Sequence, residues 1–272
     1  MLFGLFTSGY QFQDLEKAFV DAKAFGYDFI ELWGGYPHAY PWDMDEKRIA
    51  TIRSYSEKYG IPIRVYTPEH NAYPYNYMLA DERQLGRIRD YFIKSIEVAA
   101  ALGSPYMLLS VGQGDSVSAT QRQEKLLSFL RELLPQAEKN NVILLLETLT
   151  PYESNTCTTL AELKSVLQSI ASPYLQGMCD VVAAYSQEET LMDYQQALQE
   201  KFAHVHFVDA DGVSETHLLP GEGILPLADI LQYLKQMDYR GGLTVELVTH
   251  YMAHQSEAFQ KALARIKEIM HV

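Results

Sequence analysis

The sequence predicts a (β/α)8 barrel, an α/β fold in which eight parallel strands close into a cylinder that eight helices surround. Three observations favour this fold. Short apolar runs alternate with longer amphipathic stretches, the alternation occurs eight times, and 272 residues is close to the usual length of such a barrel. An open doubly wound sheet is the alternative, but it usually has a glycine-rich phosphate loop after its first strand, and TSGYQFQDLEKAF contains none.

The expected strands are short apolar runs bounded by polar or turn-forming residues, as in strands that are buried on both faces. In chain order they are residues 2–7, 28–33, 61–67, 106–111, 142–148, 175–180, 204–209 and 243–248. The fifth run, VILLLET, leads directly into Glu147. A carboxylate at such a place is costly to desolvate unless a partner binds it.

The expected helices are the amphipathic stretches that follow the strands. In chain order they are residues 14–26, 43–60, 81–102, 118–139, 159–170, 188–202, 227–238 and 255–270. The first three end at Gly26, Gly60 and Gly103, and glycine is the usual residue just after the last helical turn. No low-complexity segment, charge block or linker divides the sequence, so one domain over residues 1–272 is expected.

Charge and cysteine content limit the classes of function. The net charge of −13, from 22 basic and 35 acidic residues, disfavours nucleic acid as a partner. Cys157 and Cys179 form neither a disulfide framework nor a CxxC metal site, so free thiols in a reducing compartment are expected. The N-terminus lacks the basic segment and cleavage site of a signal peptide, and no apolar stretch reaches membrane-spanning length. A cytoplasmic protein without membrane partners is therefore expected.

Four ionisable residues stand at the C-terminal ends of consecutive expected strands: Glu147, Asp180, His206 and Glu246. Active sites of such barrels lie at this end. Because adjacent strands are about 4.8 Å apart, four inward-facing side chains there converge on one point. Three carboxylates and one imidazole suit a divalent cation such as Mn²⁺, Co²⁺, Ni²⁺ or Zn²⁺. The expected partner of Glu147 is thus a metal ion that it shares with Glu246.

Each of these residues also has a purely structural interpretation. A glutamate at a strand end is often solvated or ion-paired, Asp180 can cap the following helix, and His206 can be a buried core histidine. His204 lies on the same face of the strand as His206, so the residues alone leave the choice of ligand between the two histidines open. The coincidence of all four residues at successive strand ends favours the metal site.

Longer motifs carry a resemblance to a known family. The segments LETLTPYESN, CDVVAAY, HVHFVDADG and VELVTHYM resemble the xylose isomerase-like superfamily of sugar-phosphate isomerases and epimerases, as do the loop motifs YTPEHNAYPYN and THLLPGEG. The resemblance covers nearly the whole chain and is greatest to the fructoselysine type of 3-epimerase. It implies that Glu147, Asp180, His206 and Glu246 are the metal ligands, with Mn²⁺ as the expected ion and Mg²⁺ among the alternatives.

The resemblance also implies residues that contact the substrate. Glu153 occupies a position at which related ketose epimerases place a substrate-contacting glutamate. Further candidates lie at the ends of the second and third strands and on the loops that follow the second, third and seventh: Trp33, His38, Tyr66, Glu69, Asn71, His217 and Glu222. Related epimerases often carry a histidine and an arginine where this sequence has Ala183 and Gly212, which argues against a simple free hexulose as the substrate.

The resemblance implies metal-dependent inversion at C3 of a ketose or of a ketose-amine such as fructoselysine or psicoselysine, for which we expect Glu147 and Glu246 to transfer protons through an enediolate. The expected partner is a small sugar or a glycated amino acid. An aldose–ketose isomerase, or an epimerase of another sugar derivative, is the alternative. An endonuclease IV-like enzyme is disfavoured by the acidic charge, and because its trinuclear site needs more histidines than a total of eight readily supplies. A non-catalytic sugar-binding barrel is disfavoured by the intact ligand set. Barrels of this group often form dimers or tetramers, so a homo-oligomer is compatible with the sequence.

Overall fold

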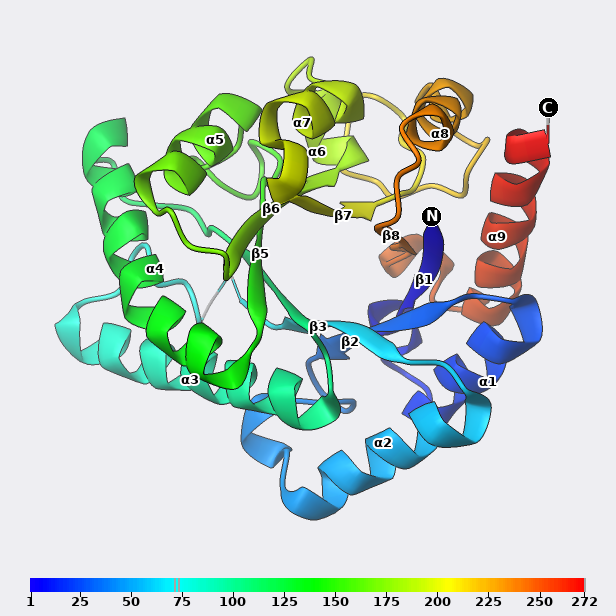
Figure 1. The fold of residues 1–272 in the computed structure, drawn as a ribbon, viewed down its shortest axis with the longest axis horizontal. Helices are drawn as coiled ribbons and strands as arrows, with labels where there is room; N and C mark the ends of the chain where they lie inside the picture. The colour runs from blue at the N-terminus through cyan, green and yellow to red at the C-terminus, as the bar shows by residue number, and fades with distance from the viewer. Residues whose placement is uncertain (71, 73, 272) are drawn as a thin grey trace.

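The computed structural model describes residues 1–70, 72 and 74–271 of the chain. Its centre is a closed barrel of parallel strands in chain order, and β8 pairs with β1 to complete the ring (Figure 1). The strands are β1 (Leu2–Phe6), β2 (Phe29–Gly34), β3 (Ile63–Pro68), β4 (Tyr106–Ser110), β5 (Ile143–Glu147), β6 (Leu175–Asp180), β7 (Phe202–His206) and β8 (Gly242–Val245). The predicted (β/α)8 barrel is confirmed.

Helices surround the barrel on its outer side (Figure 1). They are α1 (Leu15–Phe25), α2 (Glu46–Tyr59), α3 (Glu82–Leu102), α4 (Ala119–Asn140), α5 (Leu160–Ser169), α6 (Val181–Ser186), α7 (Leu191–Leu198), α8 (Leu227–Gln236) and α9 (Gln255–His271). Because α9 packs beside α1, the last unit of the chain closes the ring against the first. Among the helices of the described residues, none combines the length and the apolar character needed to cross a membrane.

The connection from β6 to β7 differs from the prediction. One helix over residues 188–202 is wrong, because α7 and a short 3-10 turn occupy this range and a further helix, α6, precedes it. Glu188 and Gln199 have left-handed backbones, with φ of 58° and 50°, which interrupt a right-handed helix. β7 also ends earlier than expected, at His206. The carboxylate of Asp209 accepts hydrogen bonds from three backbone amides of the following loop, and so turns the chain away from the sheet.

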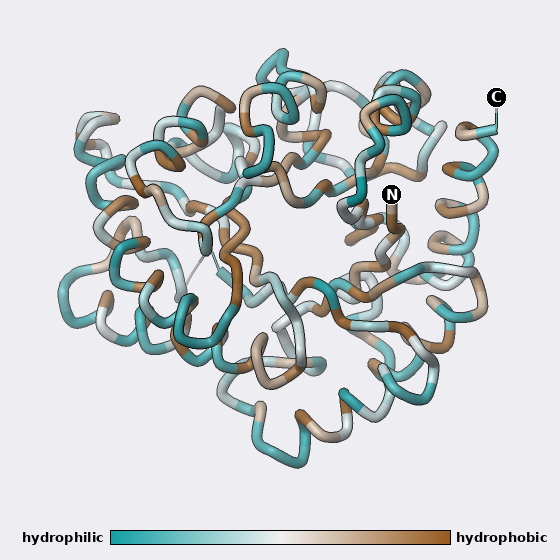
Figure 2. The backbone as a smooth tube through the Cα atoms, in the orientation of Figure 1, coloured by the Kyte–Doolittle hydropathy of each residue, from teal (hydrophilic) through white to brown (hydrophobic). Residues whose placement is uncertain are grey.

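Apolar side chains pack in two separate layers. The larger layer lies between the strands and the surrounding helices. The smaller layer fills the barrel interior with one side chain from each of β3 to β7: Val65, Leu108, Leu145, Met178 and Ala203. Figure 2 shows apolar residues along the strands and polar residues along much of the outer helices. The interior is therefore a dry plug rather than a channel.

A polar layer lies directly above this plug. Side chains alternate between the two faces of a strand, so the next inward position is two residues further along. On β3, β4, β5 and β6 these positions are Thr67, Ser110, Glu147 and Asp180, all of which are buried. The inward-facing side chains therefore change from apolar to polar over two residues of each strand. This change places the site at the C-terminal end of the barrel.

The barrel interior depends on two glycines that face the ring of Phe29. A methyl group at Gly4 would overlap this ring, and one at Gly242 would lie 2.8 Å from its Cζ atom. We expect Gly4→Ala to lower the free energy of unfolding by about 1–3 kcal/mol, because Phe29 must leave its rotamer. Urea unfolding followed by circular dichroism measures the change.

Gly86→Ala is the matched control, since Gly86 lies on α3 and, among the described residues beyond its own helix turn, an added methyl group meets no atom within 4 Å. There we expect the free energy of unfolding to rise by up to about 1 kcal/mol, because alanine favours the helix. Equal stability of Gly4→Ala and the wild type would contradict the account of the interior.

Candidate active site

A pocket of about 640 Å³ opens at the C-terminal end of the barrel. The polar layer forms its floor and the loops after the strands form its walls. Its titratable lining residues are Glu69, His70, Glu147, Glu153, Asp180, His206, Glu215, His217, Glu246 and His250. Since no lysine or arginine belongs to the described lining, the pocket is acidic.

The four predicted metal ligands meet in this pocket. They stand at the ends of β5, β6 and β7 and directly after β8. Nδ1 of His206 lies 3.0 Å from Oε1 of Glu147, 2.8 Å from Oε2 of Glu246 and 3.8 Å from Oδ2 of Asp180. The spacing of these residues at consecutive strand ends therefore brings their side chains together, as the sequence predicts.

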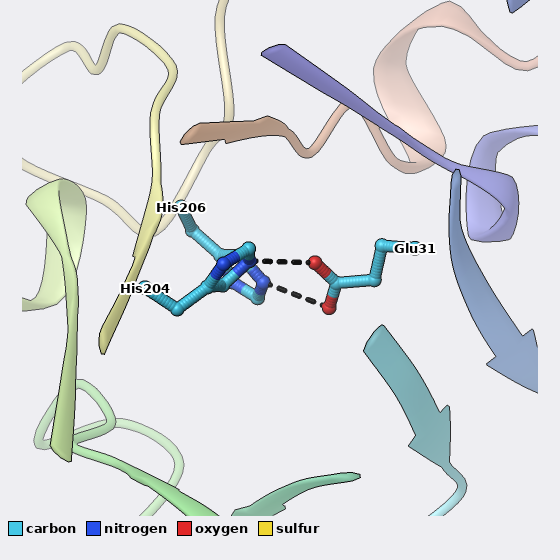
Figure 3. Close-up of side chains that lie close together, drawn as sticks. All are labelled: Glu31, His204 and His206. Carbon is cyan, nitrogen blue, oxygen red and sulfur yellow. Dashed lines mark hydrogen bonds and ion pairs between the residues drawn. The ribbon is translucent and has the colours of Figure 1, made fainter. Parts of the chain in front are cut away.

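The other side of the His206 ring is held by Glu31 on β2. Nε2 of His206 lies 3.0 Å from Oε1 of Glu31, and Nε2 of His204 lies 3.0 Å from the second oxygen of the same carboxylate (Figure 3). An ionised carboxylate only accepts hydrogen bonds, so both Nε2 atoms carry protons. Burial acts to lower the pKa of His206, but the charges of Glu246, Glu31 and Glu147 raise it well above its usual value; when the ring is neutral, its Nδ1 atom carries a lone pair.

This Nδ1 atom tests whether a metal fits. It is buried and, although carboxylate oxygens lie 3.0 and 2.8 Å away, it has no hydrogen-bond partner among the described residues. Three carboxylates around this atom require positive charge between them, which a proton on Nδ1 or a metal ion supplies. Carboxylate oxygens and an imidazole nitrogen are suitable ligands for Mn²⁺ and similar divalent ions. Groups of these residues, drawn from Glu147, Asp180, His206, His217 and Glu246, bring their ligand atoms close enough to share one ion.

Glu31 itself was not predicted as a site residue. It is fully buried and accepts a third hydrogen bond, of 2.7 Å, from Oγ1 of Thr67. Burial alone would raise the pKa of Glu31, but the charge of His206 and the hydrogen bonds from both histidines hold that pKa well below its usual range. The signal in the sequence was the carboxylate inside the apolar run DFIELW, which poses the burial cost already recognised for Glu147.

Neighbouring charges distinguish the two glutamates of the cluster. Burial, with the negative charges of Glu246 and Asp180, raises the pKa of Glu147 to about 8, although His206 opposes the shift. Burial also acts to raise the pKa of Glu246, but the charges of His206 and His217 outweigh it and lower that pKa. The two carboxyl groups thus differ in proton affinity although their residue type is the same.

Asp180 caps a helix and also faces the cluster. Its Oδ1 atom accepts hydrogen bonds from the backbone amides of Val182 and Ala183, at 2.6 and 3.0 Å, and so caps the N-terminus of α6. Its Oδ2 atom faces His206 at 3.8 Å. One side chain therefore begins a helix and contributes to the cluster.

Trp33, Glu69 and His217 line the pocket, as predicted for substrate contacts. Nε1 of Trp33 donates a hydrogen bond of 2.6 Å to Oε1 of Glu69, which fixes the indole against the loop after β3. Nδ1 of His217 lies 2.9 Å from the backbone oxygen of Glu246, so its Nε2 atom is turned toward the pocket.

Glu153 also lines the pocket, beside a second glutamate that was not predicted. Oγ1 of Thr150 lies 3.0 Å from Oε2 of Glu153 and 3.1 Å from Oε2 of Glu215. Burial of the Glu153 carboxyl and the nearby negative charge of Glu215 raise the pKa of Glu153 to about 7, although the hydrogen bond from Thr150 opposes the shift. This wall therefore gathers negative charge on one side of the pocket.

Tyr66 and His38 do not line the pocket, which corrects two predicted substrate contacts. Tyr66 points into the outer core, and its hydroxyl donates a hydrogen bond of 2.7 Å to the carbonyl of Ala39. His38 is buried behind Trp33, with ring centroids 5.8 Å apart. Both side chains support the wall from outside rather than touch a molecule inside it.

Glu222 is a third correction. It accepts hydrogen bonds from the hydroxyl of Tyr251 and from the guanidinium of Arg265, both at 2.9 Å, and lies outside the pocket. The predicted contact at Asn71 falls outside the described residues.

Two further pocket residues, His70 and Ser110, were not predicted. Ser110 is the last residue of β4, at the inward position that corresponds to Glu147 on β5. Its position at a strand end is a signal of the kind used for the carboxylates, although a hydroxyl is a weaker one. His70 lies within the loop motif YTPEHNAYPYN, next to the predicted Glu69.

Comparison with known proteins agrees with this geometry. The family model described as Xylose isomerase-like TIM barrel matches residues 19–269. Fructoselysine 3-epimerase of Shigella flexneri is 39% identical over 268 residues, which cover 98% of this chain and 97% of that protein. D-psicose 3-epimerase of Enterocloster bolteae is 24% identical over 250 residues, which cover 86% of this chain and 77% of that protein.

Solved structures show the same fold at lower identity. The crystal structure of a D-psicose 3-epimerase in the presence of D-fructose aligns over 100% of both chains, with a TM-score of 0.84 and 16% identity. Because the family model covers most of the chain and a 39% identical relative spans nearly all of it, this chain belongs to the xylose isomerase-like TIM barrel family and is an enzyme of the isomerase class.

Proposed function

We propose that the protein is a divalent-metal-dependent 3-epimerase that acts on a ketose-amine of the fructoselysine type. The observation that carries the proposal is the convergence of three carboxylates on the unpaired Nδ1 atom of His206. The similarity to fructoselysine 3-epimerase of Shigella flexneri supports the substrate class. Mn²⁺ is the ion we expect, because it suits a mixture of carboxylate and imidazole ligands.

Inversion of C3 beside a ketone requires a base on one face of the carbon and an acid on the other. When held by Glu147, Asp180, His206 and Glu246, a divalent ion supplies Lewis acidity toward the substrate oxygens. Glu147 and Glu246 reach the pocket from β5 and β8, with β6 and β7 between them, and so approach a substrate from different directions. One carboxylate takes the C3 proton, and the electron pair of the C–H bond enters the C2–C3 double bond of an enediolate. The carboxylic acid of the other returns a proton to the opposite face.

The charge of the pocket wall supports an amine-bearing substrate. Glu69, Glu153 and Glu215 line it in addition to the carboxylates of the floor, and the described lining contains no lysine or arginine. A ketose-amine carries a protonated amine on C1, which this wall attracts. A sugar phosphate carries a dianion, which the same wall repels. The acidic wall therefore favours a glycated amine over a sugar phosphate.

Proton NMR in D₂O, with fructoselysine, common ketoses and Mn²⁺, tests the reaction. We expect the wild type to introduce deuterium at C3 of fructoselysine. In Glu147→Gln and Glu246→Gln the exchange rate should fall by a factor of about 10² to 10⁴, the usual contribution of a general acid or base. Glu222→Gln is the matched control, because it makes the same change of charge outside the pocket.

Exchange at C1 would instead indicate an aldose–ketose isomerase. If the metal-loaded protein exchanges no proton in any of these sugars, the proposed substrate class is wrong. Exchange at C3 that survives in both glutamine variants would contradict proton transfer by the two glutamates.

Glu31→Gln tests the support of His206. The two histidines donate to different oxygens of Glu31, and the amide replaces one of these oxygens with an NH₂ group, which cannot accept the hydrogen bond of the histidine that faces it. We expect the affinity for Mn²⁺ or Co²⁺, measured by isothermal titration calorimetry, to fall about 10- to 100-fold, as for other residues that orient a metal ligand. Thr67→Val removes only one of the three hydrogen bonds to Glu31, and we expect a smaller loss.

Circular dichroism of the same Glu31→Gln sample distinguishes weakened metal binding from loss of the fold. A folded Glu31→Gln protein with wild-type metal affinity would show that Glu31 does not orient the ligand.

Glu153→Gln tests the acidic wall. We expect KM for fructoselysine to rise about tenfold, equivalent to about 1.4 kcal/mol, while KM for an uncharged ketose changes little. Because the pKa of Glu153 is raised to about 7, its carboxylate becomes neutral as pH falls below 7. The wild-type KM for the amine should therefore rise in that range, and the variant should lose this dependence. Steady-state kinetics from pH 5.5 to 8.5, with Glu222→Gln as control, measures both; equal effects on charged and uncharged sugars would refute the idea.

A further inference from the structure

A buried serine–histidine pair lines the pocket beside the proposed metal site. Ser110 ends β4 and His70 lies in the loop after β3, and only 1% and 8% of their surfaces are exposed. Oγ of Ser110 lies 2.6 Å from Nε2 of His70. The two-glutamate reaction proposed above uses neither residue, so the pair needs another explanation.

The second hydrogen bond of His70 fixes where the protons of the pair lie. Nδ1 of His70 bonds to the carbonyl oxygen of Pro68, and a carbonyl oxygen only accepts, so Nδ1 carries a proton. Burial lowers the pKa of His70, which keeps the ring neutral and leaves Nε2 without a proton. Ser110 therefore donates its only proton to Nε2. The Oγ atom of Ser110 is left able to accept hydrogen bonds but unable to donate one.

This acceptor stands next to the proposed chemistry. Ser110 pairs in register with Glu147 on the neighbouring strand, and both side chains line the pocket floor. Because adjacent strands are about 4.8 Å apart, the two side chains reach the same part of a bound molecule. Among the described residues, no group donates a hydrogen bond to Oγ of Ser110. Its lone pairs are therefore available to a ligand, and buried polar atoms normally have such partners.

We propose that Ser110, oriented by His70, is a specificity residue that accepts a hydrogen bond from one hydroxyl group of the substrate's sugar chain. The proposal rests on the proposed function, since it requires a sugar in this pocket. An ordinary serine either donates or accepts, and so tolerates a methyl ether in place of a hydroxyl. Ser110 has its proton committed to His70, so an ether oxygen there brings two sets of lone pairs face to face. The pair therefore selects a hydroxyl group over its ether.

The test uses the metal-loaded enzyme and fructoselysine analogues that are deoxygenated or O-methylated at C4, C5 or C6. We measure kcat/KM by the C3 exchange assay and dissociation constants by calorimetry. We expect kcat/KM of the wild type to be about fivefold to tenfold lower for one deoxy analogue than for fructoselysine, which is the usual effect of one hydrogen bond. With fructoselysine, we expect kcat/KM of Ser110→Ala to be lower than that of the wild type by a similar factor. With that deoxy analogue, kcat/KM of Ser110→Ala should fall no further, because the serine hydroxyl that would accept the hydrogen bond is already absent.

His70→Phe supplies a readout that a merely structural pair would not give. The variant releases the proton of Ser110, which can then donate to an ether oxygen. We expect the O-methyl analogue at the same carbon to bind His70→Phe better, relative to fructoselysine, than it binds the wild type. Ser95→Ala is the matched control: Ser95 is a buried serine of α3 whose hydroxyl donates to the carbonyl of Tyr91, and its removal should leave every ratio unchanged.

The outcomes separate this proposal from the proposed function. If Ser110→Ala and deoxygenation lower kcat/KM independently of each other at C4, C5 and C6, the role of Ser110 is overturned. The exchange reaction of the proposed function then still stands. If the wild type exchanges no proton, the proposed function fails, and the dissociation constants of the same analogues still decide the role of Ser110. A wild type that binds none of these sugars overturns both.

Discussion

The buried carboxylate of Glu31 sets the geometry on which the pocket depends. It accepts hydrogen bonds from Nε2 of both His204 and His206, and so turns Nδ1 of His206 toward the carboxylates at the ends of the neighbouring strands. The donors come from β7 and the acceptor from β2, so the contact crosses the barrel interior (Figure 3). Removing one partner of such a buried pair leaves an uncompensated charge, which typically costs about 3–5 kcal/mol. The position of the cluster is thus tied to the stability of the barrel.

Excess negative charge is common to the floor and the wall of the pocket. On the floor, Glu147, Asp180 and Glu246 surround one imidazole nitrogen, and a proton on the ring or a metal ion balances their charges. On the wall, Glu153 and Glu215 share one hydroxyl donor and face the space that a substrate occupies. The overall charge of −13 gives no indication of this concentration. The proposed function assigns a metal ion to the floor and a protonated amine to the wall.

The barrel and the four clustered residues could be predicted because both follow from local pattern. Apolar runs of strand length recur eight times, and a charged residue at the end of such a run can occupy few positions in the fold. Glu31 could not be assigned in this way, because its partners lie more than 170 residues away, on β7.

The sequence also could not predict which residues of β3 point into the barrel. The register between β2 and β3 shifts between Ile30 and Glu31, which changes the residues of β3 that stand opposite. A bulge of one residue exchanges the two faces of a strand. As a result Thr67, and not the predicted Tyr66, points toward the pocket.

The double role of Asp180 has a consequence for how the cluster meets an ion. Two backbone amides of α6 hold Oδ1 in place, so the rotamer of this side chain is chosen when the helix forms. The rotational entropy of Asp180 is therefore lost on folding rather than on ion capture. Glu31 restricts His206 in the same way from the other side of the ring. In the proposed metal site, we therefore expect a cluster preorganised at two of its members to discriminate among ions by fit, since these two cannot rearrange to suit an ion whose preferred coordination differs.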